Sequence, residues 1–517
     1  MKKIKILWID DEIDLLKPHI IFLEQKGYNV DTATNGIDAI NLVKENTYNI
    51  IFLDENMPGL SGLETLTEIK NIAPNIPVIM ITKSEEENIM DQAIGAKIND
   101  YLIKPVNPNQ ILLSIKKNID HKRLITQKTT MAYQAEFSKI GMEINSCNTY
   151  QEWCEIYKKL VFWEMELAAS EDNTMDEVLK MQQIDANSAF AKFIKKNYKS
   201  WFDKNNTEKP LLSPNLMQEK IFPLIKNGKK VFFLLIDNLR YDQWQTIRPA
   251  LSDFYNVEKE ELYFSILPTA TQYSRNSIFS GLMPYEIDRL YPELWKNDDE
   301  PGGKNLYEEK MLETLMHRHN ITKGLHFEKV TDINYCKKIT DNLNKYLNNY
   351  LNVAIINFVD NLSHAKTEQK MIKDLANTEN AYRSITKSWL LHSPLFEMLK
   401  KLAEHDIHLV ISTDHGSIRV NNAIRVIGDK NTTTNLRYKQ GRKLNYNPKE
   451  VFEITNPAEI YLPKNNISSA YIFSTKDDFF AYPNNYNHYV NYYKDTFQHG
   501  GISLQEMIIP AITLTPK

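Results

Sequence analysis

Val231–Asp237, which reads VFFLLID, decides the fold of the larger part of this chain. Two further apolar runs also end in aspartate, NVAIINFVD at Asp360 and IHLVISTD at Asp414. Such continuous runs of Val, Ile, Leu and Phe predict strands of a parallel sheet that is covered on both faces. Ligands of such sheets bind at the carboxyl ends of the strands. Three carboxylates at one edge repel each other unless a cation lies between them, so the pattern predicts a metal-dependent hydrolytic site.

Histidines accompany these strand ends. His364 lies four residues after Asp360, so the two side chains share one face if this turn is helical, and His415 directly follows Asp414. His499 lies near the C-terminus in QHGGIS, where we expect it to lead into a strand. With Asp237, these residues form a set of six side chains of the types that bind transition metals.

A hydroxyl and a guanidinium follow the first of the three strands. The segment SILPTATQYSRNSIFSG, residues 265–281, predicts a helix that begins at Thr269 or Thr271. The N-terminus of a helix favours an anion. Thr271 and Arg275 lie four residues apart and therefore share a helix face. A hydroxyl nucleophile beside a guanidinium suits attack on a phosphate, although a lone threonine at this point is more often a helix cap.

Length and composition limit the class of protein. A chain of 517 residues predicts about two to four domains. Its 42% hydrophobic and 25% charged residues are typical of soluble globular proteins, and its net charge of -4 provides no general attraction to nucleic acid. No apolar run is long enough to span a bilayer. Cys147, Cys154 and Cys336 form no CxxC pair, so we expect reduced thiols in a cytoplasmic protein.

The first 120 residues alternate strand and helix patterns. IKILWID, VDTA, IIFLDE, PVIMIT and DYLIKP predict five short strands of a doubly wound α/β unit. Asp10 and Asp11 follow the first strand and Asp54 ends the third, which places hard oxygen ligands together in a set suited to Mg²⁺. The Lys104 ammonium would help to neutralise a phosphoryl group on Asp54.

Two further residues complete this pattern. Thr82 ends the fourth strand, where its hydroxyl can bond the phosphoryl group, and Tyr101 on the fifth strand can follow Thr82 inward. The ordered set resembles a response-regulator receiver domain over residues 3–122. The resemblance implies that Asp54 is the phospho-acceptor, that Asp10 and Asp11 bind Mg²⁺, and that Thr82, Tyr101 and Lys104 are switch residues.

The middle of the chain is helical and lacks a DNA reader. Gly and Pro are scarce from about residue 123 to 210, and the apolar spacing is that of helices. We expect Trp153, Trp163 and Trp201 to form the core of a small bundle. Nothing here resembles a helix-turn-helix with a basic recognition helix, so the receiver must act through another output.

One basic segment, residues 419–443, could hold a phosphodiester backbone, and a solvated loop is an equally good interpretation. Its basic residues are Arg419, Arg425, Arg437, Lys439, Arg442 and Lys443.

The C-terminal metal-binding set resembles the alkaline phosphatase superfamily in its PglZ branch. That resemblance implies two metal sites and a nucleophile, Thr271, with zinc favoured over manganese. The first site would use Asp237, Thr271, Asp414 and His415. The second would use Asp360, His364 and His499.

The complete order resembles PorX-type response regulators: a receiver at 1–122, a helical linker domain at 123–210 and an alkaline-phosphatase-like α/β domain at 211–517. The resemblance implies a sensor histidine kinase, a link to type IX secretion, contact with an extracytoplasmic-function sigma factor, and a zinc phosphodiesterase for oligonucleotides or cyclic nucleotides. We further expect phosphorylation of Asp54 to produce a homodimer. Two alternatives stay open: a non-catalytic regulator with a PglZ binding surface, and a phosphomonoesterase.

Overall fold

The computed structural model describes residues 4–74, 76–83, 98–170, 173–203, 205–298, 300–330, 337, 341, 343–368, 375–376, 378–429, 432–464, 469–483 and 485–517. The chain divides into two compact units, residues 1–134 with 170–172, and residues 135–169 with 173–517. Each unit is described by itself. Among the described helices, none combines the length and the apolar character needed to cross a bilayer. Cys147 and Cys154 are free thiols, and Cys336 lies outside the described residues.

The first unit contains a five-stranded sheet in the order β2-β1-β3-β4-β5, with every neighbouring pair parallel. The expected strands are confirmed: β1 Lys5–Ile9, β2 Asn29–Ala33, β3 Ile50–Asp54, β4 Val78–Thr82 and β5 Asp100–Ile103. The helices are α1 Lys17–Gln25, α2 Gly36–Glu45, α3 Gly62–Ile72 and α5 Pro108–Ile115. Apolar clusters on both sides of the sheet explain why β1, β3 and β4 are almost entirely buried.

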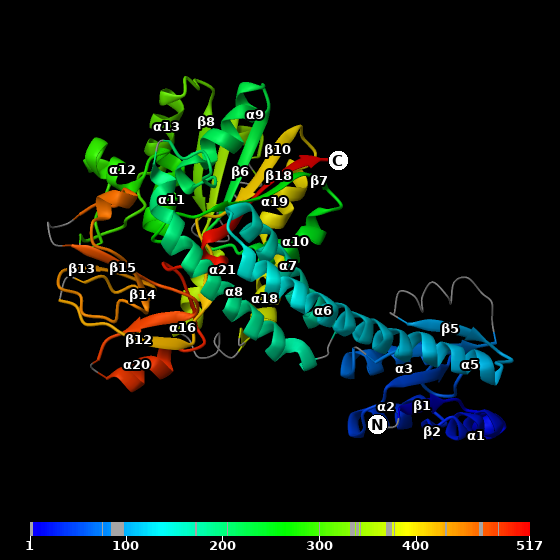
Figure 1. The fold of residues 1–517 in the computed structure, drawn as a ribbon. Coiled ribbons are helices and arrows are strands. Elements are labelled where there is room, and N and C mark those ends of the chain that lie inside the picture. Colours follow the sequence, from blue (N-terminus) through cyan, green and yellow to red (C-terminus); the bar gives the residue numbers. More distant parts are fainter. Residues whose placement is uncertain are drawn as a thin grey trace. The chain divides into compact units, whose positions relative to one another are not determined.

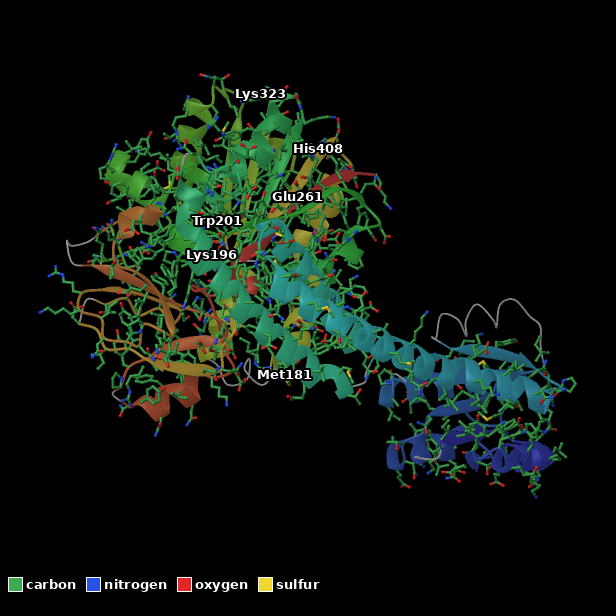
Figure 2. All side chains as sticks on the ribbon, in the orientation of Figure 1. Met181, Lys196, Trp201, Glu261, Lys323 and His408 are labelled. Atoms are coloured by element: carbon green, nitrogen blue, oxygen red, sulfur yellow. The ribbon has the colours of Figure 1, made fainter. Side chains whose placement is uncertain are left out.

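Three long helices form the middle of the chain: α6 His121–Ser146, α7 Tyr150–Ser170 and α8 Asp176–Asn197. The three tryptophans expected in their core are buried. Trp153 packs with its ring centroid 5.3 Å from that of Phe190. Trp201, labelled in Figure 2, packs against Phe264 of the following domain at 5.4 Å. The residues of α7 and α8 therefore share a compact unit with the C-terminal domain.

The C-terminal domain is built on a six-stranded sheet in the order β7-β18-β10-β6-β9-β8. Its strands are β6 Lys230–Ile236, β7 Tyr255–Phe264, β8 Leu325–Val330, β9 Leu351–Ile356, β10 Ile407–Ser412 and β18 Ile508–Pro516. The four neighbours β10, β6, β9 and β8 are parallel, as expected from their apolar runs. β18 is antiparallel to both β10 and β7, so the sheet is mixed.

Helices cover both faces of this sheet, with α11 and α13 on one side and α10, α18 and α19 on the other (Figure 1). The helices of this domain are α9 Phe222–Lys226, α10 Tyr241–Leu251, α11 Thr271–Ser280, α12 Pro284–Leu290, α13 Glu308–Arg318, α15 Leu343–Leu347, α16 Phe358–Glu368, α18 Glu379–His392, α19 Pro394–Leu402, α20 Tyr486–Tyr493 and α21 Leu504–Met507.

A second group of short strands lies between β10 and β18 in the chain. It contains β11 Ile418–Arg419 paired with β17 Phe497–Gln498, β12 Asn422–Arg425 paired with β16 Asp478–Ala481, and the sheet β13-β15-β14. The last three strands are β13 Tyr438–Gly441, β14 Val451–Ile454 and β15 Ala470–Ser474. Together with α20 they form an accessory region at one end of the domain (Figure 1).

Candidate functional site

The receiver carries a carboxylate cluster at the carboxyl edge of its sheet. Ligand oxygens of Asp10, Asp11 and Asp54 lie within 4.8 Å of one another. Lys104 reaches the same point, with its Nζ 2.8 Å from Asp10 Oδ2 and 2.9 Å from Asp54 Oδ1. Burial, together with the charges of Asp10 and Asp11, raises the pKa of Asp54 against the opposing effect of Lys104. Bound Mg²⁺ would offset this repulsion.

The expected switch residues are next to this cluster. Thr82 is fully buried at the end of β4, and its hydroxyl donates to Glu55. Tyr101 is half-buried on β5 and packs against the core under the α2–α3 face. The sequence did not indicate the hydrogen bond between Thr82 and Glu55, because it depends on how the chain turns after Asp54.

Two of the three expected strand-end aspartates follow their strands. Asp237 comes directly after β6, and Asp414 lies two residues beyond the end of β10. The third expectation was wrong in detail: β9 ends at Ile356, and Asp360 lies in the first turn of α16. The helical conformation of α16 places Asp360 and His364 on one face, as their spacing of four residues requires.

The first metal-binding group is fully buried. Ligand atoms of Asp237, Asp414 and His415 lie within 4.8 Å of one another. Thr271 is the first residue of α11, and its Oγ1 lies 3.1 Å from His415 Nε2 and 3.4 Å from Asp237 Oδ1. Asp414 Oδ2 is buried with no hydrogen-bond donor among the described residues. An unpaired carboxylate oxygen in this position fits a bound cation.

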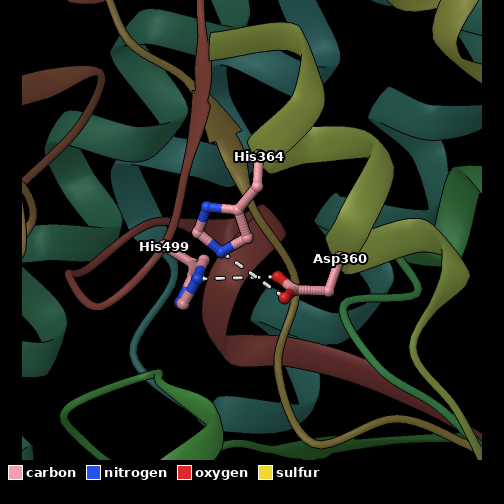
Figure 3. Close-up of side chains that lie close together, drawn as sticks. All are labelled: Asp360, His364 and His499. Atoms are coloured by element: carbon pink, nitrogen blue, oxygen red, sulfur yellow. Dashed lines mark ion pairs between the residues drawn. The ribbon is translucent and has the colours of Figure 1, made fainter. Parts of the chain in front are cut away.

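The second group lies beside the first. Figure 3 shows the imidazoles of His364 and His499 side by side and facing the Asp360 carboxylate, with His364 Nε2 at 3.4 Å and His499 Nε2 at 3.7 Å from its oxygens. The rings of His415 and His499 stack with centroids 4.2 Å apart, so the two groups are adjacent. His364 is more than half exposed, which opens the second group to solvent.

Backbone carbonyls orient the two buried histidines. Nδ1 of His415 lies 3.1 Å from the carbonyl of Gly416, and Nδ1 of His499 lies 3.1 Å from that of Thr269. A carbonyl only accepts, so each Nδ1 carries the proton and each Nε2 presents a lone pair to the site. Burial lowers the pKa of His415 and lowers the pKa of His499 to about 3. Both imidazoles are therefore neutral, as metal ligands must be.

The two carboxylates of the first group show the opposite effect of burial. Burial and the charge of Asp414 raise the pKa of Asp237 well above its usual range, and burial also raises the pKa of Asp414. Arg275 opposes this, since its Nη1 lies 2.9 Å from Asp237 Oδ2 and its Nε lies 3.4 Å from Glu308 Oε1. Lys329 Nζ pairs with Glu308 at 2.5 Å. Arg275 therefore offsets Asp237, and the charge of Asp414 is left for a divalent cation to neutralise.

Thr269 has a structural position. Its Oγ1 donates to the carbonyl of Gly501 at 2.9 Å and accepts from the Gly500 N–H at 3.0 Å. Thr269 therefore supports the loop that carries His499. That loop follows the short strand β17 and is separated from β18 by α21, so the expectation that His499 leads into a strand was wrong.

Sequence reasoning missed three polar residues at this site. Asn238, with a left-handed φ of 64°, donates its side-chain amide to Ser363 Oγ at 3.2 Å and Asp360 Oδ1 at 3.4 Å. Asn357 accepts from Arg275 Nη1 at 3.1 Å, and Glu308 holds the other side of that guanidinium. Asn238 could have been predicted as a site residue, because it directly follows the strand-end aspartate Asp237. The contacts of Asn357 and Glu308 depend on the tertiary fold.

The basic segment 419–443 is not a continuous basic surface. Arg437 is fully buried and forms a two-point ion pair with Glu506, at 2.6 and 3.1 Å. Lys439 is also buried, and Arg419 pairs with Asp495 at 2.9 Å. Both earlier interpretations, a backbone-binding strip and a solvated loop, are wrong for these residues because the segment contributes the strands β11, β12 and β13 to three small sheets.

One further carboxylate cluster is an ion network. Glu164, Asp242 and Glu379 have the spacing of a metal site, but Arg240 and Arg383 lie among them. Arg240 Nη2 lies 2.5 Å from Asp242 and 2.6 Å from Glu379. Arg383 contacts both Glu164 and Asp242. Two guanidinium groups supply the positive charge here, so these acids need no metal.

Comparison with known families agrees with this architecture. Residues 6–116 match the response regulator receiver domain, residues 123–202 the PorX response regulator linker domain, and residues 216–514 the BREX system PglZ alkaline phosphatase-like domain.

The relatives named here each cover about a quarter of this chain. The transcriptional regulatory protein ZraR of Klebsiella oxytoca is 31% identical over 27% of this chain and 32% of its own length. The CpxR homolog of Haemophilus influenzae is 38% identical over 22% of this chain and 48% of its own length. A solved receiver domain protein from Clostridium thermocellum is 33% identical, covers 23% of this chain and 98% of that chain, and has a TM-score of 0.22. The chain thus spans about a third of ZraR and about half of the CpxR homolog.

The fold and the two clusters define a class, the response regulator with an alkaline-phosphatase-like output domain. The chain belongs to the PglZ family, and its order of receiver, PorX linker and PglZ domain is that of a PorX-type fusion. Receiver domains are phosphorylated by sensor kinases and bind Mg²⁺, and alkaline-phosphatase-like domains are metalloenzymes, which suggests hydrolase activity. The Asp, His and Thr side chains of the C-terminal site are donors that fit zinc or manganese.

Proposed function

We propose that this chain is a response regulator in which phosphorylation of Asp54 controls a zinc-dependent phosphodiesterase acting on nucleotide phosphodiesters. One observation carries the catalytic part. The Thr271 hydroxyl begins α11 and lies 3.1 Å from His415 and 3.4 Å from Asp237, beside the second group of ligands. A helix N-terminus favours the phosphate that a hydroxyl at this point would attack.

Two divalent cations, when bound, would supply positive charge to the attacking and leaving oxygens. Asp237, Thr271, Asp414 and His415 would hold one cation. Asp360, His364 and His499 would hold the other. Thr271 Oγ1 would give up its proton to water and form the new bond to phosphorus, while one ester oxygen leaves with the electron pair of the broken P–O bond and takes up a proton. Water would then attack the threonine-linked phosphodiester, which restores the Thr271 hydroxyl and releases the remaining part of the substrate as a phosphomonoester.

Arg275 favours a diester over a monoester substrate. A monoester carries an additional negative charge that needs an additional cationic contact. Arg275 is buried and its guanidinium is already engaged by Asp237, Glu308 and Asn357. Its role in this geometry is to hold Asp237 in position, so the charge available to the substrate comes mainly from the two cations.

The regulatory part of the proposal uses the receiver. A sensor histidine kinase would phosphorylate Asp54, where the Lys104 ammonium and a Mg²⁺ ion held by Asp10 and Asp11 would offset the added negative charge. Thr82 would exchange its bond to Glu55 for one to the phosphoryl group, and Tyr101 would follow it inward. The link to type IX secretion, a cytoplasmic location and an extracytoplasmic-function sigma factor as partner rest on the family resemblance.

A non-catalytic regulator is the second candidate, in which the PglZ domain serves only as a binding surface. The presence of Thr271 within a complete set of ligands favours catalysis, because a surface for binding alone needs neither the hydroxyl nor the neutral histidines.

Metal analysis combined with two chromogenic substrates tests the proposal. Protein purified without chelator should contain about two transition-metal ions per chain beyond the receiver site. It should hydrolyse bis(p-nitrophenyl) phosphate faster than p-nitrophenyl phosphate, which has the same leaving group. Equal or faster turnover of the monoester would overturn the substrate class. Activity in metal-free, folded protein would overturn the metal mechanism, and no turnover of either ester by metal-loaded protein would favour the binding surface.

A further inference from the structure

The accessory region contains a cavity that no part of the metal centre uses. Its volume is about 660 Å³, and it lies between β13, β16, α20 and the residues that follow β12. This size is in the range of cavities that bind small organic ligands. The residues that line it include Ile427, Lys439, Phe480, Tyr482, Tyr489 and Tyr493.

The cavity and the metal centre lie on opposite faces of β13. Tyr438 faces the metal centre, because its hydroxyl donates to Asp298 at 3.2 Å and its ring lies against the backbone of Gly500, next to His499. Successive side chains of a strand point to opposite faces, so Lys439 faces the cavity. The cavity is therefore a separate site.

Lys439 is buried without a carboxylate partner. The residue is 1% exposed, and its Nζ donates to the carbonyl of Thr433 at 2.8 Å and lies 4.9 Å from the ring of Tyr482. Among the described residues, no carboxylate lies within ion-pair distance of this ammonium. Burial lowers its pKa to about 7. Arg437, two residues earlier on the same segment, is equally buried but has Glu506 as its counter-ion.

A buried ammonium without a counter-ion is unfavourable and is uncommon in folded proteins. The Lys439 ammonium has three N–H donors and gives one to the carbonyl of Thr433. The other two can bind a ligand. An anionic group that enters the cavity would supply the missing charge and a charge-assisted hydrogen bond.

The walls of the cavity are aromatic. Tyr489 and Tyr493 of α20 lie with ring planes 13° apart and centroids 6.2 Å apart. Phe480 of β16 is buried, whereas Tyr489 is 39% exposed and forms an accessible edge. Flat aromatic surfaces of this kind stack well on a planar ring, and base–aromatic stacking is sequence-tolerant.

We propose that this cavity is a second ligand site that binds a nucleoside monophosphate. Its phosphate pairs with Lys439, and its base stacks on the tyrosines of α20. The residues of the cavity by themselves predict a ligand with an anionic group, for Lys439, and a planar ring, for the aromatic walls. The choice of a nucleotide rests on the proposed function, because hydrolysis of a nucleotide phosphodiester releases such a molecule.

Equilibrium dialysis of radiolabelled AMP against the metal-loaded full chain tests this site. Because the metal centre can also bind a phosphate ester, the number of AMP molecules bound per chain is the decisive quantity. We expect Lys439→Met to bind one AMP fewer than the wild type, or to bind it about tenfold more weakly at that site. Tyr489→Ala, at a half-exposed position, should weaken the same site severalfold.

Lys443→Met is the matched control, because Lys443 is an exposed lysine of the same segment. It should bind AMP as the wild type does. Inorganic phosphate and adenosine, each with half of the required features, should compete more weakly than AMP. Equal AMP stoichiometry and affinity in the wild type and Lys439→Met would overturn the proposal. Hydrolysis of bis(p-nitrophenyl) phosphate by Lys439→Met, measured in parallel, shows whether the catalytic proposal stands independently.

Discussion

Asn238 shows how one residue connects the two ligand groups. It follows Asp237 with φ at 64°, a conformation that asparagine tolerates better than most residues. Its backbone N–H reaches Asp414 Oδ1 at 3.4 Å, and its amide reaches Asp360 Oδ1 at 3.4 Å. A single turn after β6 thus contacts a carboxylate of each group and keeps both at the sheet edge.

Thr271 gives the sharpest prediction at this scale. Thr271→Val keeps the shape of the side chain but removes the hydroxyl, so we expect turnover of bis(p-nitrophenyl) phosphate to fall on the order of 10³-fold or more. Thr271→Ser keeps a hydroxyl at the start of α11 and should retain most of the activity. Steady-state kinetics and metal analysis of each variant check this. Undiminished turnover by Thr271→Val would place the nucleophile elsewhere.

At the scale of elements, two contacts connect the middle helices to the metal centre. Asn187 of α8 accepts from the Leu504 N–H at 2.8 Å and thereby holds α21, which follows the His499 loop. Glu164 of α7 pairs with Arg383 of α18, which also contacts Asp242 at the start of α10. A movement of α7 or α8 would therefore reach both sides of the site.

Arg383 is the residue through which the second contact can be tested. Its side chain is 4% exposed, and its removal leaves the partly buried Glu164 without its cation. We expect Arg383→Met to lower the free energy of unfolding by about 3–5 kcal/mol. Lys387→Met, one turn further along α18 at an exposed position, should change it little. Chemical denaturation followed by tryptophan fluorescence measures both, and equal stability of the two variants would contradict the network.

Lys439 of β13 predicts a pH dependence of stability. Burial lowers its pKa from 10.5 to about 7, so between these values the unfolded chain binds more protons than the folded chain. The cost of burying Lys439 is therefore complete below about pH 7 and fades as the pH rises towards 10.5. Lys439→Met should raise the unfolding temperature at pH 7 and lose this advantage near about pH 10. Thermal scans should show no such trend for Lys443→Met, and a pH-independent difference for Lys439→Met would contradict the assignment.

At the scale of the whole molecule, the receiver and the output domain need a means of communication. Phosphorylation adds charge at Asp54 next to Lys104 and Thr82, which changes the face around β4 and β5. A self-complementary surface on that face would be used twice in a dimer, so a small local change can have a large effect on association.

We therefore expect phosphorylation of Asp54 to shift the chain from monomer towards dimer. Light scattering with Mg²⁺ and beryllofluoride, a phosphoryl analogue, should show an increase in mass that Asp54→Ala does not show. We also expect dimer formation to increase phosphodiester turnover. An unchanged mass of the wild-type chain at high protein concentration would exclude this coupling.

The sequence alone determined the parts that depend on local patterns. Continuous apolar runs ending at Asp237 and Asp414 predicted the strands and the edge where the ligands meet, because a parallel strand buried on both faces is mostly apolar up to its end. Spacing of four residues predicted that Asp360 and His364 share a helix face. The order of Asp10, Asp54 and Lys104 likewise predicted the receiver and its cluster.

Only the tertiary structure decided the contacts between segments far apart in the chain. The start of α16 before Asp360, the antiparallel position of β18 and the carbonyl of Thr269 that orients His499 depend on packing rather than on local pattern. The sequence also did not indicate which of the basic side chains are buried. Arg437 and Lys439 are both buried, yet one has Glu506 as counter-ion and the other has none, because the counter-ion comes from a segment about seventy residues away.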